Sequence, residues 1–204
     1  MMKDLFLTLL RGRYLPVEEH PFTISSSPSE NDHISVAVKE SGDFTASIGQ
    51  TGPKDRAAVL APYGRFSFML HPERKRTVFI AGGIGITPIL SMLRYMTHLK
   101  MEREVFLFYA NRTESDIAFR NELDAMGEEG SVPKLSLFHI ISKPRENWDG
   151  EKGRLNGEIL RKHLENFRDT AFYICGPPPM IEAVWRVLED KGLSDQDIFY
   201  DKFD

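Results

Sequence analysis

The segment from Thr77 to Ser91 constrains the fold more than any other part of the sequence. It begins with an apolar run over residues 78–81, continues with three glycines, and reaches Thr87-Pro88 before a second apolar run. A short apolar run rich in β-branched residues is typical of a buried strand. Thr87 suits the N-cap of a helix and Pro88 suits its first position. The segment therefore predicts a strand, a glycine turn and the start of a helix.

The glycine turn is a candidate phosphate site. Free backbone N–H groups and the positive end of a helix dipole attract anions. The usual dinucleotide fingerprint has a third glycine where this chain has Pro88. The same glycines could therefore serve the geometry of a strand–helix turn alone, and both interpretations stay open at this point.

Alternating strands and helices continue from this turn to the end of the chain. Five strands with four intervening helices predict a parallel, doubly wound sheet with helices on both faces. Ser115 or Asp116 is expected to cap the second helix, and Gly192 to follow the last one. Ligands of such sheets bind at the carboxyl ends of the strands. Besides the first strand and helix, we expect strands over 105–110, 135–141, 171–175 and 198–203, and helices over 116–126, 156–164 and 178–191.

The first 70 residues have a different pattern. Short apolar or alternating runs are separated by clusters of Gly, Pro, Ser, Asn and Asp, and no helical period is visible. This part predicts a small, incomplete antiparallel β-barrel. The polar segment 71–76 separates it from the parallel sheet, so we expect one domain over 1–72 and another over 73–204. The expected strands cover residues 5–10, 21–26, 34–38, 57–61 and 66–70.

Composition excludes several classes of protein. The 204 residues carry a net charge of −4, which gives no electrostatic footprint for nucleic acid. The single cysteine, Cys175, excludes an internal disulfide and an all-cysteine iron–sulfur cluster on this chain. The six histidines lack zinc-like spacing, so no metal site is expected. The apolar run over residues 5–10 is too short to span a bilayer, and a reducing cytoplasm is the default compartment.

Two further motifs add information. The segment Tyr173-Ile-Cys-Gly-Pro-Pro-Pro-Met180 predicts a strand end, a stiff turn and a helix start. Cys175 is expected to face the crevice there, although a cysteine taken by itself is more often a small buried hydrophobe than a reactive thiol. The segment His20-Pro-Phe-Thr-Ile-Ser-Ser26, with Ala61-Pro-Tyr-Gly-Arg-Phe66 after it, is by itself only strand-and-turn sequence.

Taken together and in this order, the three motifs resemble the ferredoxin–NADP reductase superfamily. That family pairs a flavin-binding β-barrel with a pyridine-nucleotide domain. The His-Pro-Phe-Thr form looks most like the dehydrogenase part of NADPH oxidases and ferric reductases. The segments 110–117 and 119–123 and the terminal Phe203 are also similar to the family. Compared with the family, the barrel of this chain is short.

The resemblance implies roles for matching residues. His20 stands where the flavin pyrophosphate binds, Phe22 packs on the isoalloxazine, and the Thr23 hydroxyl approaches flavin N5. Phe203 covers the flavin face until nicotinamide displaces it. The other implied flavin-binding residues are Pro21, Ser25, Ser26, Gly42, Phe44 and Thr45. Cys175 and Gly176 border the nicotinamide. The other implied nucleotide-binding residues are Gly82, Gly83, Gly85, Thr87, Pro88, Asn111, Arg112, Pro177 and Met180. Thr23, Cys175 and Phe203 are the expected catalytic positions.

The resemblance also implies an activity: transfer of hydride from NADH or NADPH to FAD, with electrons leaving to a haem, iron or iron–sulfur acceptor. Such transfer needs two stacked rings and correct orientation rather than acid–base groups. Arg112 could bind a 2′-phosphate or be a solvated loop charge, and Arg154 is a second basic candidate. The choice between the two nucleotides stays open.

Two alternatives remain. The chain could be an NAD(P)-binding electron-transfer or regulatory subunit that does not hold flavin by itself. An ordinary Rossmann dehydrogenase is the weaker alternative, because it does not explain the β-rich first third. An open barrel edge exposes backbone and apolar groups. We therefore expect a second copy or a partner chain to cover it, and any membrane contact of this cytoplasmic chain to go through a haem-bearing partner.

Overall fold

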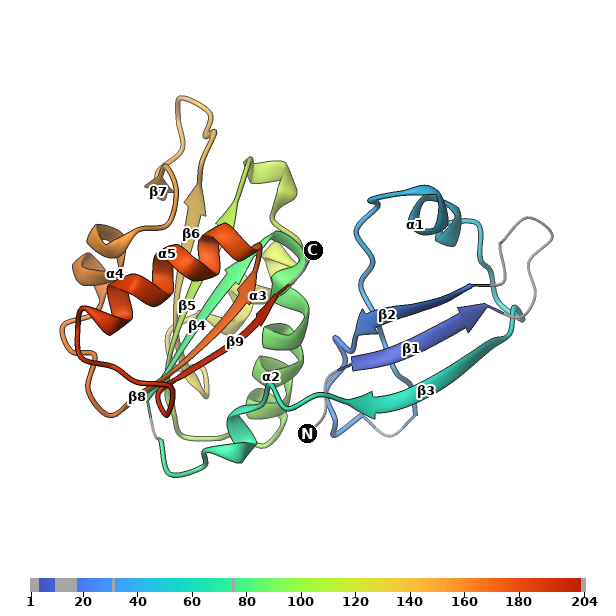
Figure 1. The fold of residues 1–204 in the computed structure, drawn as a ribbon, viewed down its shortest axis with the longest axis horizontal. Coiled ribbons are helices and arrows are strands. Elements are labelled where there is room, and N and C mark those ends of the chain that lie inside the picture. Colours follow the sequence, from blue (N-terminus) through green and yellow to red (C-terminus); the bar gives the residue numbers. More distant parts are fainter. Residues whose placement is uncertain (1–3, 10–17, 31, 75, 203–204) are drawn as a thin grey trace.

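The computed structural model describes residues 4–9, 18–30, 32–74 and 76–202, and contains two β-sheets (Figure 1). The predicted Phe203 lies outside the described residues. One sheet has three antiparallel strands in the order β2-β1-β3, and the other has six parallel strands in the order β7-β6-β5-β4-β8-β9. This architecture confirms the predicted fold class.

The parallel sheet is built around β4, which pairs with β5 on one side and β8 on the other. The strand order reverses between β4 and β8, where the connection leads away to the opposite half of the sheet. A sixth strand, β7, was not predicted, because two residues are too few to carry a pattern. The strands are β4 Arg76–Gly82, β5 Glu104–Asn111, β6 Lys134–Ile141, β7 Glu151–Lys152, β8 Thr170–Gly176 and β9 Ile198–Lys202.

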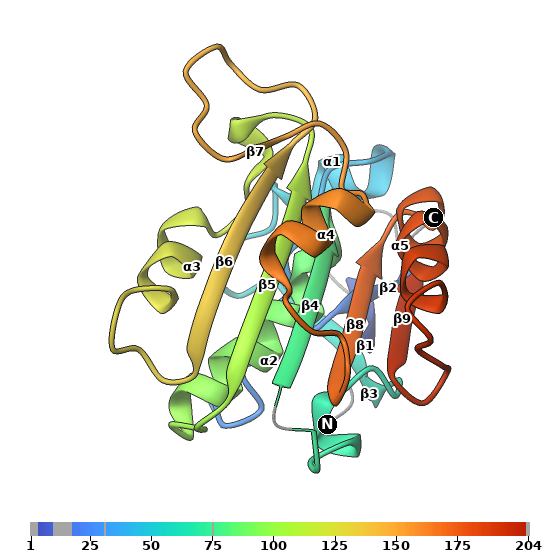
Figure 2. The ribbon, with the colours of Figure 1, turned by 90° about the vertical axis from the view of Figure 1, so that its left-hand side faces the viewer.

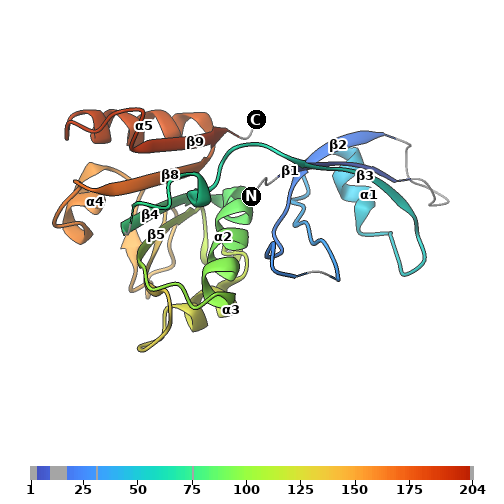
Figure 3. The same ribbon diagram turned by 90° about the horizontal axis from the view of Figure 1, so that it is seen from below.

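Helices cover both faces of this sheet, as Figures 2 and 3 show. Helices α2 (Ile86–His98) and α3 (Arg120–Met126) pack on one face, and α4 (Gly157–His163) and α5 (Pro178–Glu189) pack on the other. Successive residues of a strand point to opposite faces. In β4, Phe79 therefore joins the core under α2, while Val78 and Ile80 join the core under α4 and α5. None of the described helices has the length and apolar character needed to span a membrane.

The three-stranded sheet consists of β1 (Asp4–Leu9), β2 (Glu19–Thr23) and β3 (Ala57–Tyr63). The strand expected over residues 34–38 is wrong. Its alternating side chains have no neighbouring strand, and only an isolated bridge joins Val36 to Ile24. Ile34 is 57% exposed, so burial gives this segment no reason to become a strand.

Helical structure in the first 70 residues also corrects the prediction. Helix α1 spans Asp43–Ile48, which is too short for a helical period to show in the sequence. The strand expected over 66–70 is instead a 3-10 turn, η1 Phe68–Leu70. The Ser67 hydroxyl accepts the Met69 N–H there, and Phe66 and Phe68 are buried in the core of the parallel sheet.

Helix α5 starts at Pro178 as predicted, and the other three helices of the parallel sheet start at residues that differ from the prediction. Asn156, predicted as the first residue of a helix, is instead the N-cap of α4 and accepts the N–H groups of Glu158 and Ile159. Thr87 is not the N-cap of α2, because Gly85 occupies that position after a 3-10 turn, η2 Gly83–Gly85. Helix α3 starts later than expected because a separate 3-10 turn, η3 Glu114–Asp116, precedes it.

The end of α5 differs in a similar way. The helix ends at Glu189 with Asp190 as its C-cap, two residues before the expected end. Gly192 adopts a φ of +78° in the turn that follows, and its N–H donates to the Glu189 carbonyl. Glycine is therefore required at the predicted place, but for the turn after the helix rather than for its last residue.

Candidate nucleotide-binding site

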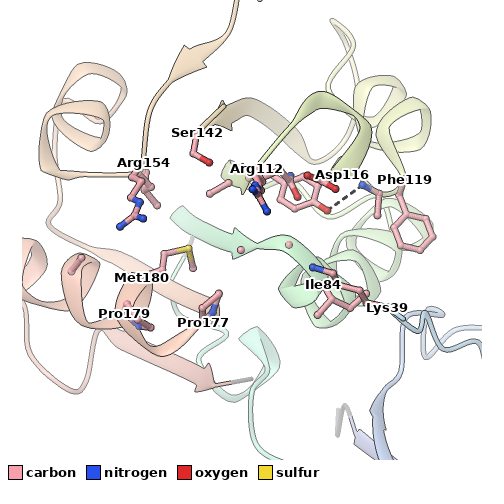
Figure 4. A pocket seen from close by; sticks show the side chains of 18 of the residues that line it. Lys39, Ile84, Arg112, Asp116, Phe119, Ser142, Arg154, Pro177, Pro179 and Met180 are labelled. Carbon is pink, nitrogen blue, oxygen red and sulfur yellow. Dashed lines mark hydrogen bonds between the residues drawn. The ribbon is translucent and has the colours of Figure 1, made fainter. Parts of the chain in front are cut away.

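A cavity of about 870 Å³ lies at the carboxyl ends of β4, β5, β6 and β8 (Figure 4). This is the place where ligands of a doubly wound sheet bind. The glycine turn forms one wall, the start of α5 another, and the segment Ala37–Lys39 reaches the cavity from the first part of the chain. The polar and charged side chains that line the cavity include Lys39, Asn111, Arg112, Asp116, Ser142 and Arg154.

The glycine turn explains why small residues are needed here. Gly83 has a φ of +53°, and a Cβ atom on it would meet nothing, so its backbone faces open space. A Cβ on Gly82 would lie 2.8 Å from Pro177 Cδ, and one on Gly85 would overlap the carbonyl oxygen of Cys175. The glycines therefore serve the geometry of the strand–helix turn and also leave its backbone accessible to a phosphate. The two interpretations of these glycines are compatible.

The second turn meets the first directly. A Cβ on Gly176 would lie 2.6 Å from Met180 Cε, and Pro177 precedes the first residue of α5. The expectation that Cys175 faces the crevice is not met, because its side chain is fully buried under α2. Its thiol points to the Asp201 carboxylate, with the sulfur 3.9 Å from Oδ2. Pro177 and Met180, by contrast, line the cavity.

Asn111 is the buried polar side chain of the cavity. It is the last residue of β5, and neither its amide nitrogen nor its oxygen has a hydrogen-bond partner among the described residues. The amide lies near the Tyr109 hydroxyl without hydrogen-bond geometry; that hydroxyl accepts the Ala118 N–H at 3.3 Å. Burial raises the pKa of Tyr109 to about 12, so the phenol is neutral at ordinary pH. A buried amide without a partner at a cavity wall is available to a ligand.

The charges around the cavity favour an anion. Three of the lining side chains are basic, Lys39, Arg112 and Arg154, and one is acidic, Asp116. The Asp116 carboxylate accepts two hydrogen bonds from Thr113, one from the backbone N–H at 2.9 Å and one from the side-chain hydroxyl at 2.8 Å. These bonds hold the pKa of Asp116 below its ordinary value. Backbone N–H groups, an open amide and excess positive charge together fit a dinucleotide with its phosphates.

The flavin motif forms an aromatic cluster between β2 and α1. The His20 ring stacks on Phe44 with centroids 3.9 Å apart, and the Phe22 ring lies 6.4 Å from Phe44. His20 Nε2 also lies 2.8 Å from a Glu18 carboxylate oxygen. Stacked rings beside a basic imidazole suit a flat, anionic cofactor. Gly42 is the N-cap of α1, and the Thr45 hydroxyl donates to its carbonyl.

The remaining residues of the flavin motif make structural hydrogen bonds. Thr23 is buried and its hydroxyl donates to Asp4 at 3.3 Å, while Pro21 is exposed. The Ser25 hydroxyl donates to the Ser35 carbonyl, and the Ser26 hydroxyl accepts the Ser35 N–H. These serines therefore shape the turn that follows β2.

Helix α2 links this motif to the nucleotide turn. The Ser91 hydroxyl donates to the Ser26 carbonyl at 2.6 Å, and Arg94 donates to the Ser25 carbonyl at 2.8 Å. Arg94 also binds both carboxylate oxygens of Glu122, at 2.6 and 2.8 Å. No sequence motif assigned a role to Ser91, Arg94, Lys39 or Ser142. Ser142 could have been found, since it directly follows an expected strand whose carboxyl end lies at the ligand edge.

The fold and this site define a dinucleotide-binding oxidoreductase domain preceded by a β-rich part. Residues 79–186 match the family described as "Oxidoreductase NAD-binding domain", and residues 6–81 match an "FAD-binding domain" family. The chain belongs to the ferredoxin reductase-like superfamily of FAD- and NAD-binding oxidoreductases. The predicted family and the predicted pair of cofactors, FAD with a nicotinamide nucleotide, are confirmed.

Curated relatives support the same family. The reductase component of propane 2-monooxygenase from Mycolicibacterium smegmatis is 30% identical over 196 residues, which is 91% of this chain and 55% of the relative. The electron transfer component of anthranilate 1,2-dioxygenase from Acinetobacter baylyi is 36% identical over 156 residues, 76% of this chain and 43% of the relative. This chain spans about half the length of the curated relatives it matches.

Solved structures show the same fold. The cytochrome b5 reductase domain of Ulva prolifera nitrate reductase superposes with a TM-score of 0.81 at 22% identity, over 98% of this chain and 84% of that one. The Amycolatopsis cytochrome P450 reductase GcoB gives a TM-score of 0.82 at 19% identity, over 99% of this chain and 60% of that one. At these identities the likeness concerns the fold alone.

Proposed function

We propose that this chain is a flavin-dependent oxidoreductase that passes hydride from NADH or NADPH to FAD and electrons on to an external acceptor. The observation that carries the proposal is the cavity itself. It lies at the carboxyl ends of the parallel strands and is bordered both by the glycine turn and by Lys39 from the first part of the chain. A site that touches both parts is what a reaction between two cofactors requires, because rate depends on how well they are oriented.

The nucleotide side of the site is assigned as follows. Gly82 and Gly83 present backbone to the nucleotide, Gly85 holds the two turns close together, and Asn111 supplies its open amide. Thr87 and Pro88 shape the start of α2. Pro177 and Met180, which line the cavity, are assigned to the wall beside the nicotinamide. Cys175, whose side chain is buried, and Gly176 are proposed to border the nicotinamide from the turn after β8.

The flavin side is assigned to the cluster between β2 and α1. When bound, FAD supplies two-electron acceptor chemistry. The chain supplies a basic ring at His20, an aromatic surface at Phe22 and a hydroxyl at Thr23. Phe203, beyond the described residues, is proposed to cover the flavin. The other residues assigned to this side are Pro21, Ser25, Ser26, Gly42, Phe44 and Thr45.

The electron acceptor, the domain division, the location and the partners of this chain are also proposals. Two relatives are named as reductase or electron transfer components of oxygenase systems. We infer from this that the acceptor of this chain is a separate haem, iron or iron–sulfur protein. We also propose that the chain divides into domains 1–72 and 73–204. Its proposed location is cytoplasmic, with membrane contact only through a partner. A second copy or a partner chain is proposed to cover the open β edge.

A second candidate is an NAD(P)-binding subunit that does not hold flavin alone. It is favoured by the contacts within the flavin motif, since the Thr23 hydroxyl is engaged by Asp4 and the His20 ring by Phe44. A flavin would have to replace these contacts, which offsets part of the free energy of its binding.

An absorbance spectrum separates the two candidates. We expect purified protein mixed with FAD to retain flavin absorbance through desalting, and NADH or NADPH to bleach it under anaerobic conditions. Circular dichroism and ADP-ribose binding serve as controls for folding and for the nucleotide site. A folded chain that binds ADP-ribose but keeps no flavin supports the second candidate, and one that binds neither contradicts both.

A further inference from the structure

Met180 places a thioether at the wall of the nucleotide cavity, beside Pro177 (Figure 4). It is the third residue of α5, and it is half-buried, with part of its surface packed against the core under α4 and α5. A Cβ atom built on Gly82 would lie 2.9 Å from its sulfur, and one built on Gly176 would lie 2.6 Å from its terminal methyl group. The thioether therefore fills the space that the two glycines leave, and its remaining surface faces the cavity.

The other methionines of the described residues are placed differently. Met69 is 38% exposed in η1 and does not line the cavity. Four others pack fully or partly against the core under α2, and they are Met92, Met96, Met101 and Met126. Among the methionines that the structure describes, Met180 is therefore the one whose chemical modification would change the nucleotide cavity directly. Met69 offers an exposed methionine for comparison.

The thioether of methionine is open to one reversible reaction. Hydrogen peroxide transfers an oxygen atom to the sulfur, so that an S–O bond forms, the O–O bond breaks and the second oxygen leaves as water. The sulfur loses two electrons and the peroxide gains them. The product, methionine sulfoxide, is polar and chiral, and methionine sulfoxide reductases convert it back. The O₂ chemistry of flavins is one source of the peroxide.

A sulfoxide oxygen on Met180 would have no room on the side of the glycines. The backbone of Gly82 and that of Gly176 already lie against the sulfur and the methyl group. The oxygen must therefore point into the cavity, or the side chain must leave the two turns and move into the cavity itself. In both cases an apolar wall of the nucleotide site becomes polar and changes its shape, which costs binding free energy.

We propose that Met180 is a reversible oxidation site, and that its sulfoxide weakens binding of the nicotinamide nucleotide. Peroxide then lowers the supply of electrons to this chain, and reduction of the sulfoxide restores it. This inference rests on the proposed nucleotide site.

Peptide mass spectrometry and calorimetry on the full chain test the inference without any turnover. The chain is treated with hydrogen peroxide, the peptides give the oxidised fraction of each methionine, and isothermal titration gives the affinity for NAD⁺ and for NADP⁺. We expect oxidation of Met180 to weaken binding by about tenfold, as the loss of an apolar contact to a polar group implies. Treatment of the oxidised wild-type chain with both sulfoxide reductases, one for each epimer, should restore the affinity.

Met180→Leu removes the sulfur and roughly conserves the volume, so peroxide should leave the affinity of this variant at its own untreated value. Met69→Leu is the matched control and should lose as much affinity as the wild-type chain. Oxidation of Met69 without oxidation of Met180 overturns the inference. So does a Met180 sulfoxide with unchanged affinity, or an equal loss in Met180→Leu. An untreated chain that binds neither nucleotide contradicts the proposed function, and this inference with it.

Discussion

Gly85 shows how one residue sets the geometry of the cavity. Its backbone has an ordinary helical conformation, with φ of −57°, so conformational freedom is not the reason for glycine. The reason is contact, because a Cβ atom would overlap the Cys175 carbonyl. The absence of a side chain lets the turn after β4 touch the turn after β8. At the same junction Gly82 lies against Pro177 and Met180, and all three residues line the cavity.

We predict that Gly85→Ala lowers the free energy of unfolding by about 2 kcal/mol, the usual cost of overpacking a tight contact. Denaturation in urea measures the change. Gly52→Ala is the control, since a Cβ there meets nothing within 4 Å and its φ is not in the left-handed region. A Gly85→Ala chain as stable as the Gly52→Ala chain would show that the two turns separate without cost.

At the scale of elements, helix α2 connects the two motifs. Its first turn follows the glycines, and its middle binds the turn after β2 through Ser91 and Arg94. Arg94 is partly buried and also holds Glu122 of α3. One rigid helix thus sets the position of the flavin motif relative to the nucleotide turn.

We predict that Arg94→Ala lowers the free energy of unfolding by about 1–2 kcal/mol, because the Ser25 carbonyl and the Glu122 carboxylate lose a charged donor. Hydrogen exchange of the amides in 24–27 should become faster. Arg186→Ala, on an exposed position of α5, is the control for loss of an arginine. Unchanged exchange in 24–27 would mean that Arg94 does not hold this turn.

At the scale of the whole molecule, the β-rich part lies beside α2 and away from α4 and α5 (Figure 3). Within the described residues, β3 pairs only with β1, and every residue of β3 is exposed. Val59 and Leu60 are 45% and 54% exposed. A strand with a free edge and apolar side chains is a surface on which another chain can pair.

We predict that the purified chain associates through β3, and that Leu60→Lys shifts it to the monomer in size-exclusion chromatography with light scattering. Leu99→Lys is the control, because Leu99 is similarly exposed but caps α2. A monomer whose β3 amides exchange quickly would point to a partner polypeptide instead. A monomer whose β3 amides are protected would contradict the proposed covering of this edge.

The sequence by itself determined the parts of this protein that depend on neighbouring residues. The buried strand over 105–110, the glycine turn and the start of a helix at Pro178 can be predicted, because apolar periodicity and backbone geometry depend on a few neighbouring positions. Tertiary structure decided what depends on partners. Residues 34–38 found no strand to pair with, and Cys175 turned toward the α2 core. Arg112, Ser142 and Arg154 came together only because the sheet sets β5, β6 and β7 side by side, and no local pattern encodes that order.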